Sequence, residues 1–234
     1  MNKPTPSPFH VIIVAAGSGQ RMGGSLPKQY QDLAGKSVLQ HSIDLFESMP
    51  ECKSITVAIS PEHQNLFDDK IKGKNLYVIH GGKTRQDSVH NALKSLNCAQ
   101  DDFVLIHDAA RPLVTAQDIR ILCKALASEQ AASLASPVRD TLRYSDDEGF
   151  AANNIERDNL WAIETPQGFH YGILKQAHEK FGHEKAYSDD TKIVSEFNVK
   201  TKLIASSTPN FKITYADDFL LAETLLLSNT QRKD

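Results

Sequence analysis

Short apolar runs alternate along this chain with stretches of helical periodicity. The runs have the length of buried β-strands and end at Gly, Pro or charged residues; they lie at residues 11–14, 54–60, 76–80 and 103–106. The intervening stretches place apolar side chains on one helical face, at residues 37–49, 85–96 and 116–128. Strands that alternate with helices favour parallel pairing with right-handed crossovers. The pattern therefore predicts an α/β fold, a mostly parallel sheet flanked by helices.

Residues 137–161 interrupt this alternation. They contain two polar, β-leaning runs on either side of an Asp-Asp-Glu-Gly turn, which predicts a β-hairpin. A hairpin on its own is marginal in water unless it packs against something. Its few apolar residues fit packing against a second subunit, and a surface excursion without a partner fits equally well.

The remaining segments follow simpler expectations. Residues 1–8 contain three prolines and are expected to form a disordered lead-in. Residues 164–168, Glu-Thr-Pro-Gln-Gly, are expected to form a loop. The C-terminal part is expected to add two helices, a strand and a final amphipathic helix, at residues 171–180, 191–197, 202–206 and 216–227.

Composition and charge limit the class of protein. A chain of 234 residues suits one α/β domain, so residues 1–234 are expected to form one unit with the hairpin as an insertion. Net charge is −3 and the pI is about 6.3, so no global basic field indicates a nucleic-acid partner. The three cysteines lack CxxC spacing, which favours reduced thiols in the cytoplasm over disulfides or a zinc site. The N-terminus lacks an apolar signal core and no run is long enough for a bilayer, so no membrane association is expected.

The glycine-rich stretch at residues 15–31 follows the first predicted strand. It contains the cations Arg21 and Lys28, and no acidic residue precedes Asp32. Its spacing matches neither the dinucleotide fingerprint nor the P-loop, because Met22 and Ser25 stand where those motifs need Gly and Lys. Glycine content alone slightly favours an ordinary strand-to-helix turn with solvated cations. Exposed N–H groups, two cations and no nearby acid instead suit a polyphosphate.

Two further polar segments follow predicted strands, where open α/β sheets bind ligands. Asp108 lies just after the predicted strand at 103–106. A carboxylate at this position suits Mg²⁺ that is shared with phosphate oxygens, although an Asp in a turn often only caps backbone N–H groups. Two alanines, Ala109 and Ala110, leave room for a base or sugar beside it. Residues 81–88 form a second glycine turn, which suits both nucleobase recognition and a helix N-terminus capped by Thr84.

The chain offers no convincing covalent nucleophile or metal motif. His178 and His183 are five residues apart, so a helix places them on different faces, and no nucleophile elbow is present. The available groups are cations, glycines and a carboxylate. That inventory fits nucleotidyl or phosphoryl transfer by positioning and charge stabilisation.

A family resemblance accompanies these features. The segments VAAGSGQRMGG, LPKQY, GGKTRQDSV, HDAARP, PVRDT, ERDNLW, ETPQ and NFKIT occur in the order typical of one family, over about residues 9–228. The chain resembles the 2-C-methyl-D-erythritol 4-phosphate cytidylyltransferases of the non-mevalonate isoprenoid pathway. The resemblance implies a Rossmann-like, nucleotidyltransferase-type fold in which residues 137–161 form a protruding hairpin arm for homodimerisation.

The resemblance also implies a reaction and roles for individual residues. The phosphate of methylerythritol phosphate attacks the α-phosphorus of CTP with Mg²⁺ or another divalent cation bound, and pyrophosphate leaves. The implied catalytic residues are Arg21 and Lys28, and the implied metal ligand is Asp108. Candidate nucleotide-binding residues are Ala15, Ala16, Gly17, Gly82, Asp87, Ser88 and Ala109. Candidate residues for the sugar phosphate are Arg111, Thr141, Arg157, Thr165, Ser188, Asp189 and Lys212, with Thr141 and Arg157 serving the neighbouring subunit's site.

The sequence leaves two alternative functions open. A cytidylyltransferase for another polyol phosphate, such as ribitol 5-phosphate, shares the glycine loop and the aspartate. A catalytically silent nucleotide-binding module is disfavoured by the presence of Arg21, Lys28, Asp108 and Lys212. Some relatives carry a second fused enzyme; this chain ends in a polar tail soon after its last predicted helix, and a stand-alone enzyme is expected.

Overall fold

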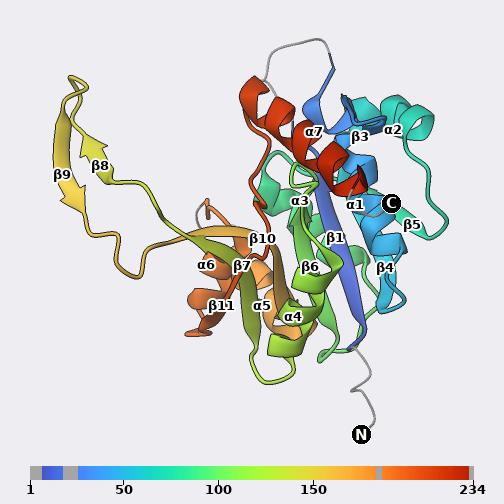
Figure 1. Cartoon of the computed structure of the whole chain (residues 1–234). Helices are drawn as coiled ribbons and strands as arrows, with labels where there is room; N and C mark the ends of the chain where they lie inside the picture. The colour runs from blue at the N-terminus through green and yellow to red at the C-terminus, as the bar shows by residue number, and fades with distance from the viewer. Residues whose placement is uncertain (1–6, 18–25, 183–185, 232–234) are drawn as a thin grey trace, which may run out of the picture.

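The computed structural model describes residues 7–17, 26–182 and 186–231. A seven-stranded sheet in the order β11-β7-β10-β6-β1-β4-β5 forms its centre (Figure 1). The strands are β1 (Phe9–Ala15), β4 (Cys52–Ile59), β5 (Leu76–His80), β6 (Phe103–Asp108), β7 (Ala131–Pro137), β10 (Trp161–His170) and β11 (Thr201–Ala205). Neighbouring strands pair in parallel, except that β10 runs antiparallel to both β6 and β7. The predicted mostly parallel α/β sheet is confirmed.

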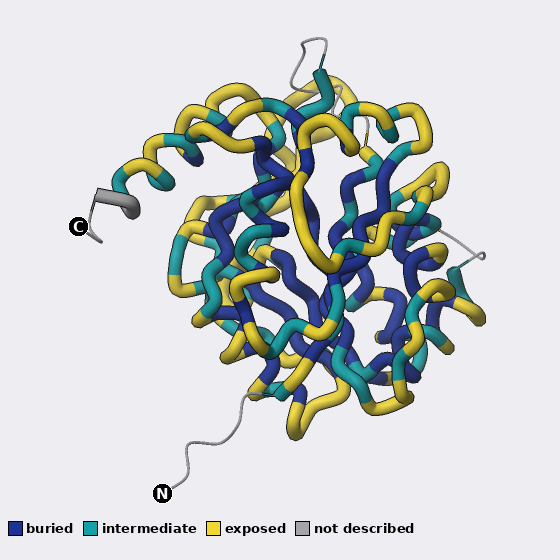
Figure 2. The backbone as a smooth tube through the Cα atoms, turned by 90° about the vertical axis from the view of Figure 1, so that its right-hand side faces the viewer, coloured by how far each residue is buried: buried dark blue, intermediate teal, exposed yellow. Residues whose placement is uncertain are grey.

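Helices cover both faces of the sheet and enclose two apolar clusters. The first face packs against α1 (Val38–Glu47), α2 (Gln64–Lys70) and α4 (Ala116–Leu126). The second face packs against α3 (Arg85–Ser95), α5 (Tyr171–Phe181) and α6 (Asp190–Ser195). Short 3₁₀ turns, η2 (Lys28–Tyr30) and η3 (Pro61–His63), complete these layers. Figure 2 shows the buried stretches of backbone gathered in the middle, with exposed connections around them.

The central strand β1 shows why this sequence forms three layers. Side chains alternate between the faces of a strand, so Val11 and Ile13 join the first cluster while Ile12 joins the second. All three side chains are fully buried. A strand that is apolar on both faces is stable only between two helical layers. The continuous apolar run at the start of the chain therefore places β1 in the interior.

A third, smaller cluster attaches the C-terminal helix. Helix α7 (Ala216–Gln231) packs its Ala222 with Leu33 and Leu113, close to the small ribbon of β2 (Asp32–Leu33) and β3 (Lys36–Ser37). Ile213, from the segment before α7, is fully buried in the same cluster. The segment at residues 210–214 is thereby held beside the ends of β1 and β6.

The predicted hairpin is present as β8 (Leu142–Ser145) paired with β9 (Ala151–Ile155) in antiparallel register. Figure 1 shows it standing clear of the sheet on two extended connections. Its aromatic side chains are exposed, Tyr144 to 63% and Phe150 to 66%. Within the described chain the two strands of the arm pair extensively only with each other, and Tyr144 and Phe150 remain uncovered.

The structure corrects one predicted element and adds several, including the β2–β3 ribbon. Residues 164–168 are not a loop but lie inside β10, where pairing with β7 shifts register between Ile163 and Gln167. The Thr165–Pro166 peptide there is cis. Strand β7 and helix α2 were not predicted. The predicted lead-in at residues 1–8 falls mostly outside the described residues, since only residues 7 and 8 are described.

Candidate active site

A cavity of about 510 Å³ opens at the carboxyl ends of β1 and β6 and at the N-terminus of α3. Parallel α/β sheets bind their ligands at this edge. Among the described residues, its lining includes predicted site residues from four separate segments: Ala15, Ala16, Gly17, Lys28, Gly82, Ser88, Asp108, Ala109 and Lys212. The fold therefore brings together six of the seven predicted nucleotide contacts, one predicted catalytic cation and the predicted metal carboxylate.

The end of β1 is fixed by a buried glutamine. The side-chain amide of Gln29 donates to the carbonyl oxygens of Ala15, at 2.8 Å, and Gly17, at 2.9 Å. Gly17 has no positive φ, and a Cβ placed on it meets nothing within 4 Å. Its open surroundings face the cavity. The other glycines of the stretch and Arg21 lie outside the described residues.

The turn before α3 forms the capped helix N-terminus that was one of the two interpretations of the sequence. Thr84 and Asp87 form a capping box, in which each side chain accepts a hydrogen bond from the other residue's backbone N–H. Ser88 donates to the carbonyl of Thr84, at 2.9 Å, and accepts from the N–H of Gly82, at 3.0 Å. A Cβ on Gly82 would lie 2.2 Å from the Cβ of Asp87, so the turn requires glycine there. Asp87 thus holds the turn and does not line the cavity.

Asp108 is held between two cations at the base of the cavity. Its Oδ1 accepts from Nε of Arg85 at 2.9 Å, and its Oδ2 accepts from Nζ of Lys212 at 2.6 Å. Its backbone N–H donates to the hydroxyl of Thr165 at 3.0 Å. Burial alone would raise the pKa of Asp108, but Arg85 and Lys212 outweigh it and hold that pKa well below its usual range. Asp108 is therefore a carboxylate at every physiological pH.

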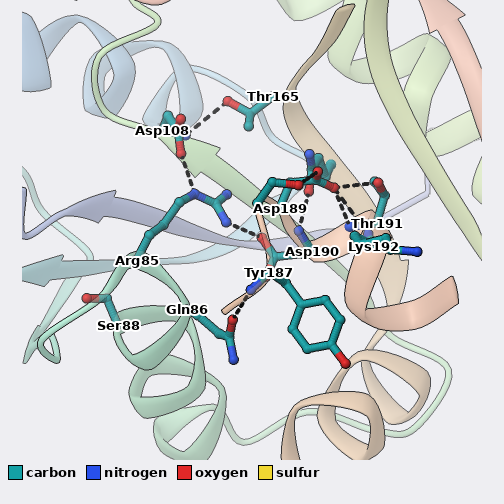
Figure 3. Close-up of polar contacts among 12 residues, drawn as sticks. Arg85, Gln86, Ser88, Asp108, Thr165, Tyr187, Asp189, Asp190, Thr191 and Lys192 are labelled. Atoms are coloured by element: carbon teal, nitrogen blue, oxygen red, sulfur yellow. Dashed lines mark hydrogen bonds and ion pairs between the residues drawn. The ribbon is translucent and has the colours of Figure 1, made fainter. Parts of the chain in front are cut away.

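Arg85 joins this carboxylate to a second, fully buried one, as Figure 3 shows. Its Nη1 donates to Oδ2 of Asp190 at 2.7 Å. The other oxygen of Asp190 lies 2.9 Å from Nε2 of His178, and neither of these side chains is exposed. Gln167 orients the pair by accepting from the backbone N–H of Asp190 at 3.0 Å. Arg85, Asp190 and His178 were not predicted as site residues, although Arg85 occupies the first helical position after a predicted glycine turn.

The segment at residues 210–214 brings two lysines to the cavity. Nζ of Lys28 donates to the carbonyl of Ile213 at 2.6 Å, next to Lys212 in the chain. The N–H of Ile213 in turn donates to the carbonyl of Ala110 at 2.8 Å. Lys28 and Lys212 are both half-buried, so their ammonium groups reach the cavity.

Most of the residues predicted to bind the sugar phosphate do not line the cavity. Arg111 is turned into the protein, where its Nη1 donates to the carbonyl of Asn210 at 2.6 Å and burial lowers its pKa. Thr165 is buried beneath Asp108. Asp189 caps α6 by accepting from the N–H groups of Thr191 and Lys192, and Ser188 donates to Asp189. None of these four predicted residues lines the cavity in the described structure.

Thr141 and Arg157 lie at the base of the arm, away from the cavity. Both are exposed, and Nη1 of Arg157 donates to the carbonyl of Arg139 at 2.9 Å. Within this chain they do not join the other predicted site residues. No helix among the described residues is both long and apolar enough to cross a bilayer.

The comparisons with known proteins agree on one family. The family model for 2-C-methyl-D-erythritol 4-phosphate cytidylyltransferase matches residues 9–228. The enzyme of that name from Desulforamulus reducens is 37% identical over 221 residues, covering 92% of this chain and 94% of its own. The bifunctional enzyme IspD/IspF of Paramagnetospirillum magneticum is 41% identical over 217 residues; the match covers 92% of this chain but only 56% of that longer enzyme.

Solved structures give the same result. The crystal structure of the Francisella tularensis 2-C-methyl-D-erythritol 4-phosphate cytidylyltransferase has a TM-score of 0.81 and 31% sequence identity, covering 93% of this chain and 99% of that one. The Thermus thermophilus enzyme has a TM-score of 0.79 at 29% identity, covering 93% and 98%. Cavity, sequence and fold agree: this chain belongs to the 2-C-methyl-D-erythritol 4-phosphate cytidylyltransferase family.

Proposed function

We propose that this chain joins CTP to 2-C-methyl-D-erythritol 4-phosphate in the cavity around Asp108, giving 4-diphosphocytidyl-2-C-methyl-D-erythritol and pyrophosphate. Family membership supports this reaction over transfer to another polyol phosphate. The observation that carries the assignment of the site is the convergence of the predicted nucleotide contacts, Lys28 and Asp108 on one cavity.

Lys28 and Arg21 are proposed to stabilise charge on the reacting phosphorus. When the sugar phosphate attacks the α-phosphorus of CTP, negative charge gathers on the phosphoryl oxygens. A cation already held in place needs no reorganisation at that moment. Lys28 meets this condition because its ammonium is anchored to the carbonyl of Ile213 at 2.6 Å. Arg21 is assigned by its motif position alone.

Lys212 is proposed to exchange partners when the sugar phosphate binds. It now pairs with Asp108 at 2.6 Å, but its side chain is 36% exposed, so it can turn toward a phosphate in the cavity. Arg85 keeps its contact with the other oxygen of Asp108 and holds the carboxylate in position. The attacking phosphate would thus gain a cation without leaving Asp108 unpaired.

Asp108 is also proposed to hold Mg²⁺ that arrives with the triphosphate. It is the one carboxylate that lines the described cavity, and Mg²⁺ usually binds one or two carboxylates together with phosphate oxygens and waters. The oxygen that Lys212 releases is the available ligand atom. When bound, the metal neutralises phosphate charge and orients the leaving pyrophosphate.

The arm is proposed to complete the site of a second subunit. Thr141 and Arg157 stand at its base and Tyr144 and Phe150 expose aromatic surface, which supports burial against another copy of the chain. Such a homodimer would bring Arg157 to the neighbouring sugar phosphate. A cytoplasmic location is proposed as well, because the three cysteines are free thiols.

Pyrophosphate release tests the proposed reaction. We expect turnover with CTP, Mg²⁺ and 2-C-methyl-D-erythritol 4-phosphate, and little with ribitol 5-phosphate under the same conditions. A preference for ribitol 5-phosphate would replace the substrate assignment. Absence of turnover with both, in a folded protein that binds CTP, would favour the silent nucleotide-binding module.

A further inference from the structure

A group of three metal-binding side chains lies at the end of the sheet opposite the active-site cavity. His10 is the second residue of β1, Asp102 immediately precedes β6, and Cys98 lies in the connection between α3 and β6. Their ligand atoms all lie within 4.8 Å of one another. Asp102 and Asp108 are separated by the length of β6, roughly 20 Å at 3.3 Å per residue. The group is therefore separate from the catalytic cavity.

We propose that His10, Cys98 and Asp102 form a Zn²⁺ site with water as a fourth ligand. Zn²⁺ prefers imidazole nitrogen, thiolate sulfur and carboxylate oxygen, and three protein ligands plus water is a common set. Metal–ligand distances of about 2.0–2.3 Å place tetrahedral ligand atoms roughly 3.3–3.8 Å apart. The group therefore closes by about 1 Å on binding. The half-buried, partly exposed setting of Cys98 permits that movement and gives the ion a path from solvent.

The surroundings orient His10 as metal sites require. Its Nδ1 lies 2.7 Å from the hydroxyl of Ser54 on the adjacent strand, which fixes the ring. Its Nε2 faces Oδ2 of Asp102 at 3.7 Å, beyond hydrogen-bonding distance. Histidines that bind a metal through one ring nitrogen characteristically use the other in a hydrogen bond, as Nδ1 of His10 does with Ser54. When Nδ1 carries the proton, a lone pair of Nε2 faces a carboxylate oxygen, and a bound cation would relieve their repulsion.

Asp102 is positioned by two further groups. Its Oδ2 accepts from the backbone N–H of Ala99 at 2.9 Å, which ties it to the connection that carries Cys98. Its Oδ1 lies 3.7 Å from the ammonium of Lys53, which is exposed. Lys53 already supplies positive charge, so it competes with a metal ion for Asp102. This competition gives the proposal a direct test, because removing the ammonium should strengthen metal binding.

The spacing of these three ligands along the sequence does not indicate a metal site. The ligands come from β1 and from two points in the α3–β6 connection, and the only short interval among them, from Cys98 to Asp102, matches no zinc motif. Parallel pairing of β1 with β6, in which Phe9 opposes Phe103, brings the ends of these strands together. The sheet thus supplies a proximity that the linear order conceals.

Cobalt binding gives a specific readout, because a thiolate ligand to Co²⁺ produces a charge-transfer absorption band. The untagged, metal-stripped full chain is titrated with Co²⁺ in a phosphine reductant, followed by Zn²⁺. We expect a thiolate band that saturates at one Co²⁺ per chain and disappears when Zn²⁺ displaces it. Absence of the band, or its persistence in Cys98→Ser, would overturn the proposal.

Matched variants separate binding from general effects on the fold. Cys52→Ser is the control, because Cys52 packs in the cluster on the other face of the sheet, and it should leave the band unchanged. Ser54→Ala should weaken binding by about 10–100-fold, as loss of an outer-shell partner usually does. Lys53→Gln should strengthen binding several-fold. Zinc affinity that is unaltered in Asp102→Asn, which keeps an acceptor for Ala99, would also refute the site.

Discussion

Replacing Arg85 by methionine should destabilise the protein strongly, because Arg85 is the shared partner of two buried carboxylates. Its guanidinium lies 2.9 Å from Asp108 and 2.7 Å from Asp190. Asp108 keeps Lys212 after the change, whereas the fully buried Asp190 keeps His178. Breaking a buried ion pair typically costs about 3–5 kcal/mol of unfolding free energy. Since His178 remains, we expect the free energy of unfolding to fall by about 3 kcal/mol. This corresponds to a melting temperature lower by roughly 6–12 °C for a chain of this size.

The pH dependence of this loss identifies its cause. Burial would raise the pKa of Asp190, but Arg85 and His178 lower it below the usual value. A carboxyl group whose pKa is lowered on folding stabilises the folded state fully at pH values above its unfolded pKa of about 3.9. This stabilisation is lost as pH falls through the folded pKa. In Arg85→Met the pKa of Asp190 rises toward or above that value. The difference between the two proteins should therefore be full at pH 7 and should shrink as pH falls below about 4.

Urea unfolding followed by circular dichroism, at one fixed protein concentration, measures this difference. Lys36→Met is the matched control: Lys36 also pairs with a carboxylate, that of Asp44, but both side chains are exposed, to 54% and 37%. Its unfolding curve should overlay that of the wild type. A loss below about 1 kcal/mol for Arg85→Met, or a loss independent of pH, would refute the reasoning about a buried shared cation.

Three further predictions concern catalysis and the glycine turn. Lys28→Ala should lower kcat by roughly 10²–10³-fold with an unchanged circular dichroism spectrum, and near-normal turnover would remove Lys28 from the chemistry. Arg157→Ala should raise KM for the sugar phosphate and leave CTP affinity intact, which a selective loss of CTP binding would contradict. Gly82→Ala should cost about 1–3 kcal/mol and weaken CTP binding, because its Cβ would lie 2.2 Å from that of Asp87. For the free energy of unfolding, Gly17→Ala is its control, since a Cβ there meets nothing within 4 Å, and equal losses of stability in the two variants would argue against a steric cause.

The sequence predicted elements wherever apolar periodicity was strong. Strand β5 and the start of α3 lie at the predicted residues, because a continuous apolar run and a capping Thr84 mark them. Strand β7 was missed because its sequence, AASLASP, consists mostly of small side chains without a clear β pattern. Pro166 and Gly168 suggested a loop inside β10. In the structure a Cβ on Gly168 would lie 2.7 Å from Leu126 and 2.9 Å from Leu105, so this glycine permits close packing within a strand.

The candidate site was predictable where a residue follows a strand directly. Asp108 and Gly82 were found in this way, and both line the cavity. The Arg85–Asp190 pair was not, because its members are 105 residues apart and each resembles a solvated surface charge in sequence. Thr165 and Asp189 were assigned to the substrate, but here they hold Asp108 and the N-terminus of α6. Such supporting contacts depend on which elements become neighbours, and single-sequence patterns do not contain that information.

The short segment before α7 has a kinetic consequence. Lys212 and the carbonyl that anchors Lys28 belong to adjacent residues, and the N–H of Ile213 fastens both to Ala110, which lines the cavity. A displacement that suits one lysine must shift the other. An inhibitor that occupies only the proposed sugar-phosphate site should therefore be competitive with the sugar phosphate. Against CTP it should give mixed inhibition, because the segment at residues 210–214 couples the positions of the two lysines.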